Sequence, residues 1–359
     1  MCIRDRFRHF AVGDSVPSRQ LTSDRINTLT TELETLGPRS GLLDIDLIGQ
    51  ATDVEARLFV LESQARDLES EASALRKVGE DIRIATVCSK LAKIVAKSED
   101  QAIDLLAGAL WIAKLDNPEL DVESYVSAVD SMAGAIRKGF EPEMSADDRI
   151  ALLDKYFFVE NGFHGSRTDY YNAANSHLDR VIDDREGLPI TLSVLYMAIA
   201  DRLDLNVVGV GLPGHFVVRH DPESGNAKDA TEGQLIDVFS RGKRLSRNEA
   251  NAMVSRALRS APRKTDFDAS TKKSILIRML NNLRGTAQGT ADSEALRRYI
   301  EAMVAIDPDD AGLRGARSVV RHQAGRTKAA VDDLDWILER EPEGIDLNQV
   351  RRMRQLFAE

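Results

Sequence analysis

The segment at 184–239 constrains the fold of this chain more than any other part of the sequence. Its first half is strongly apolar and predicts a buried helix over 190–203. Three short runs rich in β-branched and aromatic residues follow and predict strands at 206–211, 215–220 and 234–239. The polar, glycine-containing stretch 221–233 predicts a hairpin loop between the last two strands. A helix followed by a small antiparallel sheet indicates an α+β core.

Two residues of this segment are of the types that form a catalytic His–Asp pair. His215 begins the second predicted strand, and Asp237 lies in the third. A helix start that faces a His and an Asp from neighbouring strands is the arrangement of papain-like and transglutaminase-like sites. We therefore expect His215 and Asp237 to meet in a cleft, where Asp237 accepts a hydrogen bond from one ring nitrogen and fixes the tautomer.

Several motifs together resemble the SirB-type family, bacterial proteins with a transglutaminase-like core followed by tetratricopeptide-like helices. The motifs are YFFVENGFHG at 156–165, DY at 169–170, NS at 175–176, GLPITLS at 187–193 and PGHF at 213–216. The resemblance runs from about residue 100 to the C-terminus. Ser166 and Val238 depart from it, since the family usually has Asn and Pro there. The resemblance implies a regulatory or interaction role.

The position of the nucleophile carries a proline. A transglutaminase core reads roughly Gly-x-Cys, a helix, Leu-Gly, a strand, His and then Asp. With Asp204 aligned to the Gly of Leu-Gly, His215 and Asp237 fall on the His and Asp positions, and Pro189 falls on the Cys position. Proline has no nucleophile, so thiol chemistry is excluded at this position. Proline is also favoured at the first position of a helix, because its missing N–H has no intrahelical partner there.

Thr191 and Ser193 are the hydroxyls nearest to that position, and they keep an alternative open. An adjacent His215 could activate either of them in a hydrolase or acyl transferase. Against this alternative, both residues lie inside the predicted helix, where hydroxyls can bond to carbonyl groups of the preceding turn. Neither has the strained turn that exposes a serine nucleophile.

The remaining candidates are spread over one loop and one helix. The loop at 163–175 supplies further candidates for lining the cleft, namely Asn175, Asp169, Tyr170 and His164. His164 and His177 lack the spacing of a metal site, and no phosphate-binding glycine loop is present, so we expect neither metal nor cofactor. Cys88 lies on a helix face and is expected to be a buried apolar residue.

The composition argues against some classes of binding partner and favours one cellular compartment. The net charge of -10 argues against nucleic acid and anionic membranes as partners, and no apolar run reaches the length of a membrane span. Two cysteines suit a reducing cytosol, so we expect a cytoplasmic protein. Residues 1–20 resemble translated sequencing-adapter sequence, and we expect them to be disordered and foreign to the native protein.

The rest of the chain predicts helices. In the N-terminal region they are expected at 21–34, 53–68, 80–96, 100–114, from 121 and at 146–159, followed by a short helix at 175–182. The basic stretch 241–244 is expected to be a solvated turn, and 260–268 a linker. Beyond it, helices are expected at 270–285, 293–305, 311–324 and 327–340.

The last four helices carry an internal repeat. Pro308 and Pro342 are 34 residues apart, the tetratricopeptide period, and Ile300 meets Leu334 at the same offset. Roughly two such units fall short of a free-standing array, so we expect them to lean on the core. The predicted domains are a helical region at 21–145, a transglutaminase-like core at 146–260 and a helical tail at 261–359. Together they predict a non-catalytic interaction protein with unknown protein partners.

Overall fold

One long helix covers a region for which the sequence predicts two. The computed structural model describes residues 54–97, 99–170, 172–221 and 233–358, and the predictions for 1–20 and 21–34 lie outside them. Helix α4 (Val54–Val95) runs without a break through the polar stretch between the two predicted helices. The chain divides between Glu80 and Asp81 into two compact units, and α4 contributes to both. The features below belong to the second unit.

Three capped helices follow α4. They are α5 (Leu105–Ala113), α6 (Val122–Arg137) and α7 (Ala146–Asp154). The side chains of Asp104, Asp121 and Ser145 each accept a hydrogen bond from a backbone N–H of the first turn, which is the usual role of an N-cap residue. A short 3₁₀ turn, η3 (Asp100–Ala102), precedes α5, so the predicted helix at 100–114 starts later than expected.

Short regular elements lie between α7 and the central helix, among them the short helix predicted at 175–182. A π-helical turn (Lys155–Glu160) extends α7, and a parallel pair of two-residue strands joins β1 (His164–Gly165) to β2 (Glu186–Gly187). Between these strands lie the 3₁₀ turn η5 (Ala173–Ser176) and helix α8 (Leu178–Asp184). The parallel pair brings the loop at 163–176 to the start of the central helix α9 (Pro189–Arg202).

The main sheet has four antiparallel strands in sequence order. They are β3 (Val207–Val210), β4 (Val217–His220), β5 (Gln234–Asp237) and β6 (Lys243–Leu245). The prediction of a solvated turn at 241–244 is therefore wrong in its second half. Arg241 and Gly242 form the turn, but Lys243 and Arg244 pair with β5, because β5 offers them an otherwise open edge.

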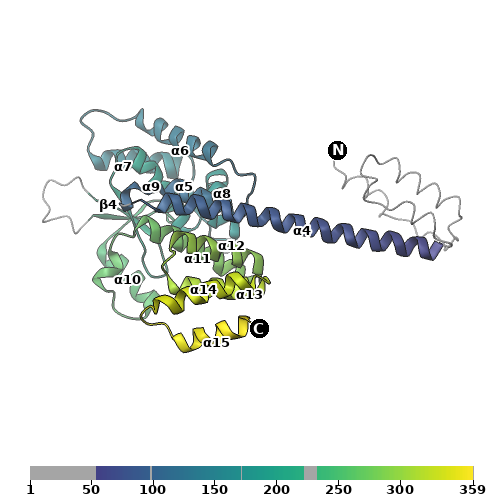
Figure 1. The fold of residues 1–359 in the computed structure, drawn as a ribbon. Helices are drawn as coiled ribbons and strands as arrows, with labels where there is room; N and C mark the ends of the chain where they lie inside the picture. Colours follow the sequence, from purple (N-terminus) through teal and green to yellow (C-terminus); the bar gives the residue numbers. More distant parts are fainter. Residues whose placement is uncertain (1–53, 98, 171, 222–232, 359) are drawn as a thin grey trace. The chain divides into compact units, whose positions relative to one another are not determined.

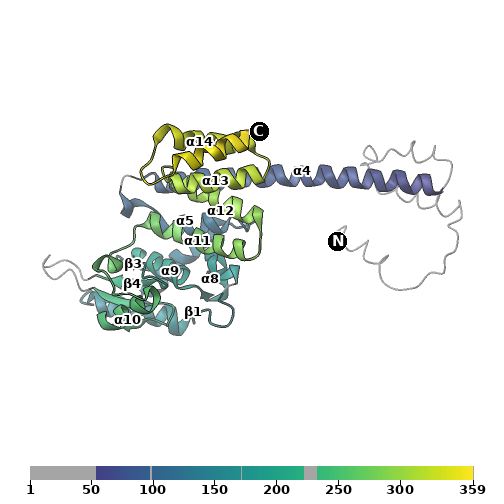
Figure 2. The ribbon, with the colours of Figure 1, turned by 90° about the horizontal axis from the view of Figure 1, so that it is seen from below.

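Two layers of helix cover the sheet. Phe216, Val218, Ile236 and Val238 pack into the main core with α9, whereas Val217, Leu235 and Leu245 face helix α10 (Arg247–Leu258). This alternation has the period of two that a strand imposes. Figure 2 shows β3 and β4 between α9 and α10. The residues at 260–268 include a 3₁₀ turn, η6 (Lys264–Phe267), and Phe267 is buried against α10 rather than lying in an open linker.

The C-terminal part is a stack of helices, as the 34-residue repeat predicts. Successive helices pack against one another in the order α11 (Lys272–Gly289), α12 (Ser293–Ile306), α13 (Ala311–Gln323), α14 (Thr327–Arg340) and α15 (Leu347–Ala358) (Figure 1). The equivalent residues Ile300 and Leu334 are both buried. The fifth helix, α15, was not predicted.

One hydrophobic core joins the central helices to the first repeat. It includes residues of α5, α6, α8, α9, α11 and α12. The prediction of an α+β fold is confirmed by the small sheet among the helices, and the C-terminal helices stack as the repeat predicts. Within the part of the chain that the structure describes, no helix combines the length and apolarity needed to cross a membrane.

Candidate functional site

The start of α9 is closely packed and carries a proline at its first position. Leu188 is the N-cap residue and Pro189 the first helical residue, and both are buried. Gly187 before them is required by space, because a Cβ atom there would lie 2.8 Å from Val181 Cγ2 and 2.9 Å from Thr191 Oγ1. The GLPIT sequence therefore has a structural explanation that does not depend on catalysis.

The two candidate hydroxyls have different surroundings. Thr191 Oγ1 accepts a hydrogen bond from the Leu188 N–H at 3.0 Å and donates to the Asn175 carbonyl oxygen at 2.8 Å. This closes the helix start in the manner of a capping box and fixes the loop that carries Asn175. Ser193 Oγ is fully buried and has no hydrogen-bond partner among the described residues. Neither hydroxyl is hydrogen bonded to His215 within those residues.

These surroundings predict opposite effects of substitution on stability. Thr191→Val is expected to lower the free energy of unfolding by about 1–2 kcal/mol, because it removes both hydrogen bonds of the buried hydroxyl and leaves the Leu188 N–H and the Asn175 carbonyl oxygen with only their mutual contact at 3.3 Å. Ser193→Ala is expected to change it by less than about 1 kcal/mol, or to raise it, because it removes a buried hydroxyl that makes no hydrogen bond. Urea denaturation of the two variants checks this. A loss of more than about 2 kcal/mol for Ser193→Ala would show that its hydroxyl has a partner.

His215 and Asp237 come together at one end of the inner strands β4 and β5, as their positions in the sequence predict. His215 Nε2 lies 3.1 Å from Asp237 Oδ1, and both side chains are largely buried. The distance is that of an ion pair, but the angle is not that of a directed hydrogen bond. Burial alone would raise the pKa of the Asp237 carboxyl, but the contacts with His215 and Ser240 outweigh it and hold that pKa below its usual value.

Helix α11 and an aromatic pair hold this region in place. The half-buried guanidinium of Arg278 donates to the carbonyl oxygens of Leu212 and His215 at 3.1 and 2.8 Å, which anchors the loop that leads into β4. The edge of the Phe239 ring meets the His215 ring at a centroid distance of 6.2 Å, and Tyr170 meets Phe239 at the same distance. Tyr170 is thus linked to His215 through the Phe239 ring.

Two other predicted cleft residues form hydrogen bonds within their own loop. Asn175 is buried, and its amide donates to the Asp169 carbonyl oxygen at 2.7 Å. Asp169 accepts a side-chain hydrogen bond from Asn172 at 2.8 Å. His177 lies elsewhere, because its Nε2 contacts Asp116 Oδ2 at 2.7 Å. Asn175 and Asp169 are thus occupied in hydrogen bonds that fix the shape of this loop.

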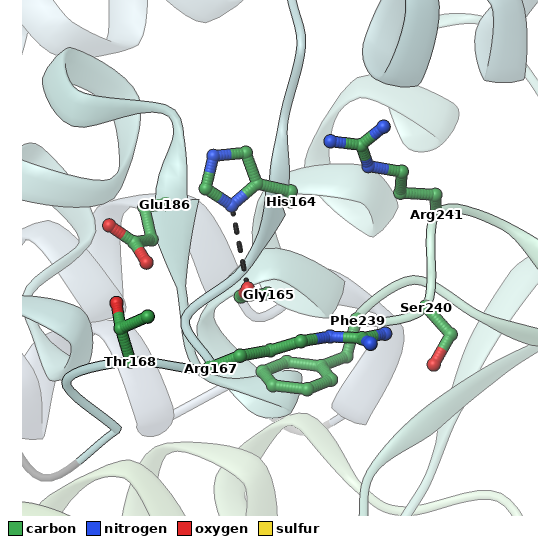
Figure 3. A pocket seen from close by; sticks show the side chains of 8 residues that line it. All are labelled: His164, Gly165, Arg167, Thr168, Glu186, Phe239, Ser240 and Arg241. Carbon is green, nitrogen blue, oxygen red and sulfur yellow. Dashed lines mark hydrogen bonds between the residues drawn. The ribbon is translucent and has the colours of Figure 1, made fainter.

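A cavity of about 470 Å³ lies beside the His215–Asp237 pair. Its walls come from the β1 loop, from β2 and from the turn between β5 and β6 (Figure 3). The lining residues are His164, Gly165, Arg167, Thr168, Glu186, Phe239, Ser240 and Arg241. Gly165 allows the close approach of these segments, since a Cβ atom there would lie 2.3 Å from the Phe239 ring. Of the predicted cleft residues, only His164 lines this cavity. Arg241 belongs to the basic stretch that was interpreted as a solvated turn, and Arg167 lies in the predicted loop at 163–175 but was not among the candidates.

The described residues offer no metal site and no activated thiol. No group of three or more His, Cys, Asp or Glu side chains in this part of the chain could hold a metal ion. Cys88, on α4, is largely buried beside the charged side chains of the repeat helices. Burial is the largest cause that raises the pKa of its thiol to about 12, with Glu301 adding to the effect and Arg317 and Arg321 opposing it.

Comparison with protein families confirms a transglutaminase-like domain followed by tetratricopeptide repeats, as the resemblance implies. The transglutaminase-like superfamily matches residues 123–281, and the tetratricopeptide repeat matches residues 283–355. The first match contains Pro189, His215 and Asp237. The second begins within α11 and ends within α15.

Three relatives illustrate the range of similar proteins. A UPF0162 protein of Xylella fastidiosa is 27% identical over 267 residues, which span 72% of this chain and 91% of the relative. Protein SirB1 of Salmonella typhimurium is 25% identical over 202 residues, 56% of this chain and 72% of SirB1. F-box only protein 21 of Mus musculus is 32% identical over 304 residues, 77% of this chain and 48% of the relative. No solved structure matches the chain.

Proposed function

Since this chain joins a transglutaminase-like domain to tetratricopeptide repeats in the manner of the SirB-type family, we propose that it is a non-catalytic protein-interaction scaffold. The domain combination fits such a scaffold, because stacked helical hairpins present extended surfaces to partner proteins. The finer part of the proposal is that the transglutaminase-like site has lost its chemistry and persists as a vestigial cleft. We expect a cytoplasmic protein.

One observation carries the proposal: the start of α9 holds Pro189 where this kind of site needs a nucleophile. A helix start lowers the pKa of a thiol placed there, and a nearby His can take its proton, so the position is specific to the chemistry. The nearby hydroxyls do not substitute for a thiol, because Thr191 is engaged with backbone groups and Ser193 is fully buried.

The His215–Asp237 pair has a reason to persist without catalysis. Both side chains are largely buried, and the carboxylate of Asp237 also accepts a hydrogen bond from the Ser240 N–H at 3.2 Å. Losing one partner would leave the other buried without compensation, which is more unfavourable than keeping both. The pair therefore stabilises the turn that leads from β5 to β6, whether or not it acts on a substrate.

The test separates binding from catalysis. The intact chain is assayed for amine incorporation and for peptide and amide hydrolysis, beside Ser193→Ala and His215→Asn. We expect no activity above the buffer background in any of the three. Partners captured by the intact chain are then purified, and their binding is measured by calorimetry. Hydrolysis or acyl transfer that disappears in Ser193→Ala or His215→Asn would overturn the proposal in favour of a hydroxyl-dependent enzyme.

A second prediction concerns the thiol that remains. Because the pKa of Cys88 is raised to about 12, little thiolate is present at neutral pH. In a Cys2→Ser variant, which leaves Cys88 as the single cysteine, labelling by a thiol-directed reagent at pH 7 is expected to be at least about a hundredfold slower than for free cysteine. Unfolding in urea should restore the fast rate. Fast, stoichiometric labelling of the folded chain together with loss of a measurable activity would contradict the proposal.

A further inference from the structure

The cavity beside the His215–Asp237 pair has a polar and basic wall that the vestigial site does not explain. Arg167 and Arg241 line it from different segments. Figure 3 shows His164, in β1, between Glu186 and Arg241. Thr168 and Ser240 add hydroxyl groups, and the Phe239 ring adds an apolar surface. Glu186 is the one acidic side chain among the lining residues.

The two arginines differ from their neighbours in their contacts. Within the described ranges, the guanidinium groups of Arg167 and Arg241 make no hydrogen bond and no ion pair, although the Arg241 backbone N–H donates to the Val238 carbonyl oxygen at 3.2 Å. By contrast, Arg244 lies in the adjacent strand β6 and contacts Asp154 at 2.7 Å, and Arg219 in β4 is held by Asp221. In a chain with a net charge of -10, carboxylates are abundant, yet two guanidinium groups facing one cavity are left to solvent. Such groups are available to an anion from outside the chain.

The backbone at Arg241 also favours a role for its side chain. Arg241 has a φ of 56°, in the left-handed region, and is followed by Gly242 at 75°. A residue without a β-carbon is more easily accommodated at the first of these positions than an arginine. Arg241→Gly therefore removes the guanidinium without disturbing the turn, which makes it a clean test of the side chain.

The chemistry of the walls indicates the class of ligand. Guanidinium groups bind carboxylate and phosphate oxygens through paired, charge-assisted hydrogen bonds. A cavity of about 470 Å³ is larger than one such group, so it can also accept the side chain or chain end that carries it. The acidic chain as a whole and Glu186 at the wall disfavour a polyanion such as nucleic acid.

We infer that this cavity recognises an oxyanion carried by a partner protein, either a carboxylate or a phosphorylated side chain. The inference rests on the proposed function, because it takes the partner to be a protein. It gives the vestigial site a use, since Phe239 and Ser240 belong to the cavity while contacting His215 and Asp237 respectively. The pair and the turn thus hold one wall of the recognition site.

The test uses short probe peptides that differ at one position and are blocked at both ends. The central residue is Glu, phosphoserine or Gln, and a fourth peptide keeps Gln but has a free C-terminal carboxylate. Binding to the isotope-labelled full chain is followed by NMR, through the shifts of Gly165 and of the backbone amides at 239–241. We expect at least one anionic peptide to bind, the blocked Gln peptide to bind at least about tenfold more weakly, and added salt to weaken binding. Which anionic peptide binds distinguishes a carboxylate from a phosphate.

Matched variants test whether the peptides bind in the cavity. Arg241→Gly and Arg167→Gln are each expected to weaken binding about tenfold or more, whereas Arg244→Gln, whose side chain contacts Asp154 instead, should leave it unchanged. The urea midpoint of Arg241→Gly should equal or exceed that of the parent chain, which separates lost binding from lost folding. The inference is overturned if no anionic peptide binds, if the blocked Gln peptide binds equally well, if Arg241→Gly binds as the parent does, or if a single-stranded oligonucleotide binds more tightly than every peptide. These results leave the activity assays unaffected, so the inference and the proposed function fail separately.

Discussion

Replacing Asp333 with asparagine is expected to lower the free energy of unfolding by about 3–5 kcal/mol, because it removes the charge that balances three partly buried arginines. Asp333 lies on α14 and is 2% exposed. Its carboxylate accepts hydrogen bonds from Arg314 at 3.4 Å, Arg317 at 2.8 Å and Arg321 at 3.0 Å, all from α13. The spacing of these arginines places them on one face of α13.

The neighbouring carboxylate cannot replace the lost charge. Glu301 on α12 already binds Arg321 at 2.6 and 2.7 Å and lies 3.5 Å from Arg317. In Asp333→Asn, Arg314 would lose its ion pair, and Arg317 and Arg321 would share one carboxylate. Helix α14 should therefore lose its fixed position against α13, and a fixed position of paired helices is the property that a tetratricopeptide surface needs for binding.

Urea denaturation followed by circular dichroism measures this effect. The matched control is Asp332→Asn, because Asp332 is adjacent in sequence but exposed, and its substitution should change stability by less than about 0.5 kcal/mol. Equal stability of the two variants would mean that the arginines are satisfied without Asp333. Raised salt should lower the free energy of unfolding of the parent chain only slightly towards that of Asp333→Asn, since salt screens buried ion pairs weakly.

The parts of the fold that the sequence predicts well are those with a strong periodic or turn signal. Pro189 marks the first residue of α9, and the 34-residue spacing locates α12 and α14. Helix α4 was divided in two because its middle carries acids and serines without an apolar stripe, yet nothing there except Gly79 opposes a helix. Hydrophobic periodicity reports burial, so it fails where a helix is solvated on all sides.

Missed elements had weaker signals of different kinds. Helix α10 has few apolar residues, but Ser246 and Glu249 form a capping box with reciprocal hydrogen bonds, and this spacing could have located its start. Strand β6 is three residues long and basic, so only its pairing with β5 defines it. The domain boundaries proposed from the sequence stay predictions.

In the candidate site, too, the predicted features are those with a clear signal in the sequence. Order and spacing along the chain predicted that His215 and Asp237 would meet and that Pro189 would occupy the helix start. The basic cavity could not be predicted, because it depends on the parallel pairing of His164 with Glu186 and on the turn at Arg241. Both are tertiary features of two or three residues, and such short pairings leave no periodic pattern in a sequence.

The second large effect is expected for Asp116→Asn, which should lower the free energy of unfolding at pH 7 by about 2–4 kcal/mol. Asp116 follows α5 and joins three parts of the molecule. Its Oδ2 contacts His177 Nε2 at 2.7 Å and accepts from the Tyr299 hydroxyl at 2.8 Å, while Oδ1 accepts from Arg298 Nε at 2.7 Å. The substitution should loosen the contact between α8 in the core and α12 in the first repeat.

The loss should depend on pH in a defined direction. Burial alone would raise the pKa of the Asp116 carboxyl, but His177, Arg298 and Tyr299 together hold it below its usual value. A carboxyl whose pKa is lower in the folded chain stabilises the fold fully above its unfolded pKa of about 3.9, and this stabilisation is lost as the pH falls through the folded pKa. The difference in stability between the parent and Asp116→Asn should therefore be constant near neutral pH and shrink below about pH 4.

Urea midpoints at pH 7, 5 and 3.5 measure that difference, with Glu119→Gln, an exposed neighbour, as the control. Asp116→Asn should retain some acid sensitivity, since the pKa of Asp237 is also lowered and its contribution follows the same direction. A difference that stays constant down to pH 3.5 would show that the Asp116 charge is not the source of the stability. A stability difference between the parent and Asp116→Asn that grows on acidification would contradict the hydrogen-bond network at Asp116. In that network a protonated carboxyl no longer balances Arg298, so acid must reduce the difference.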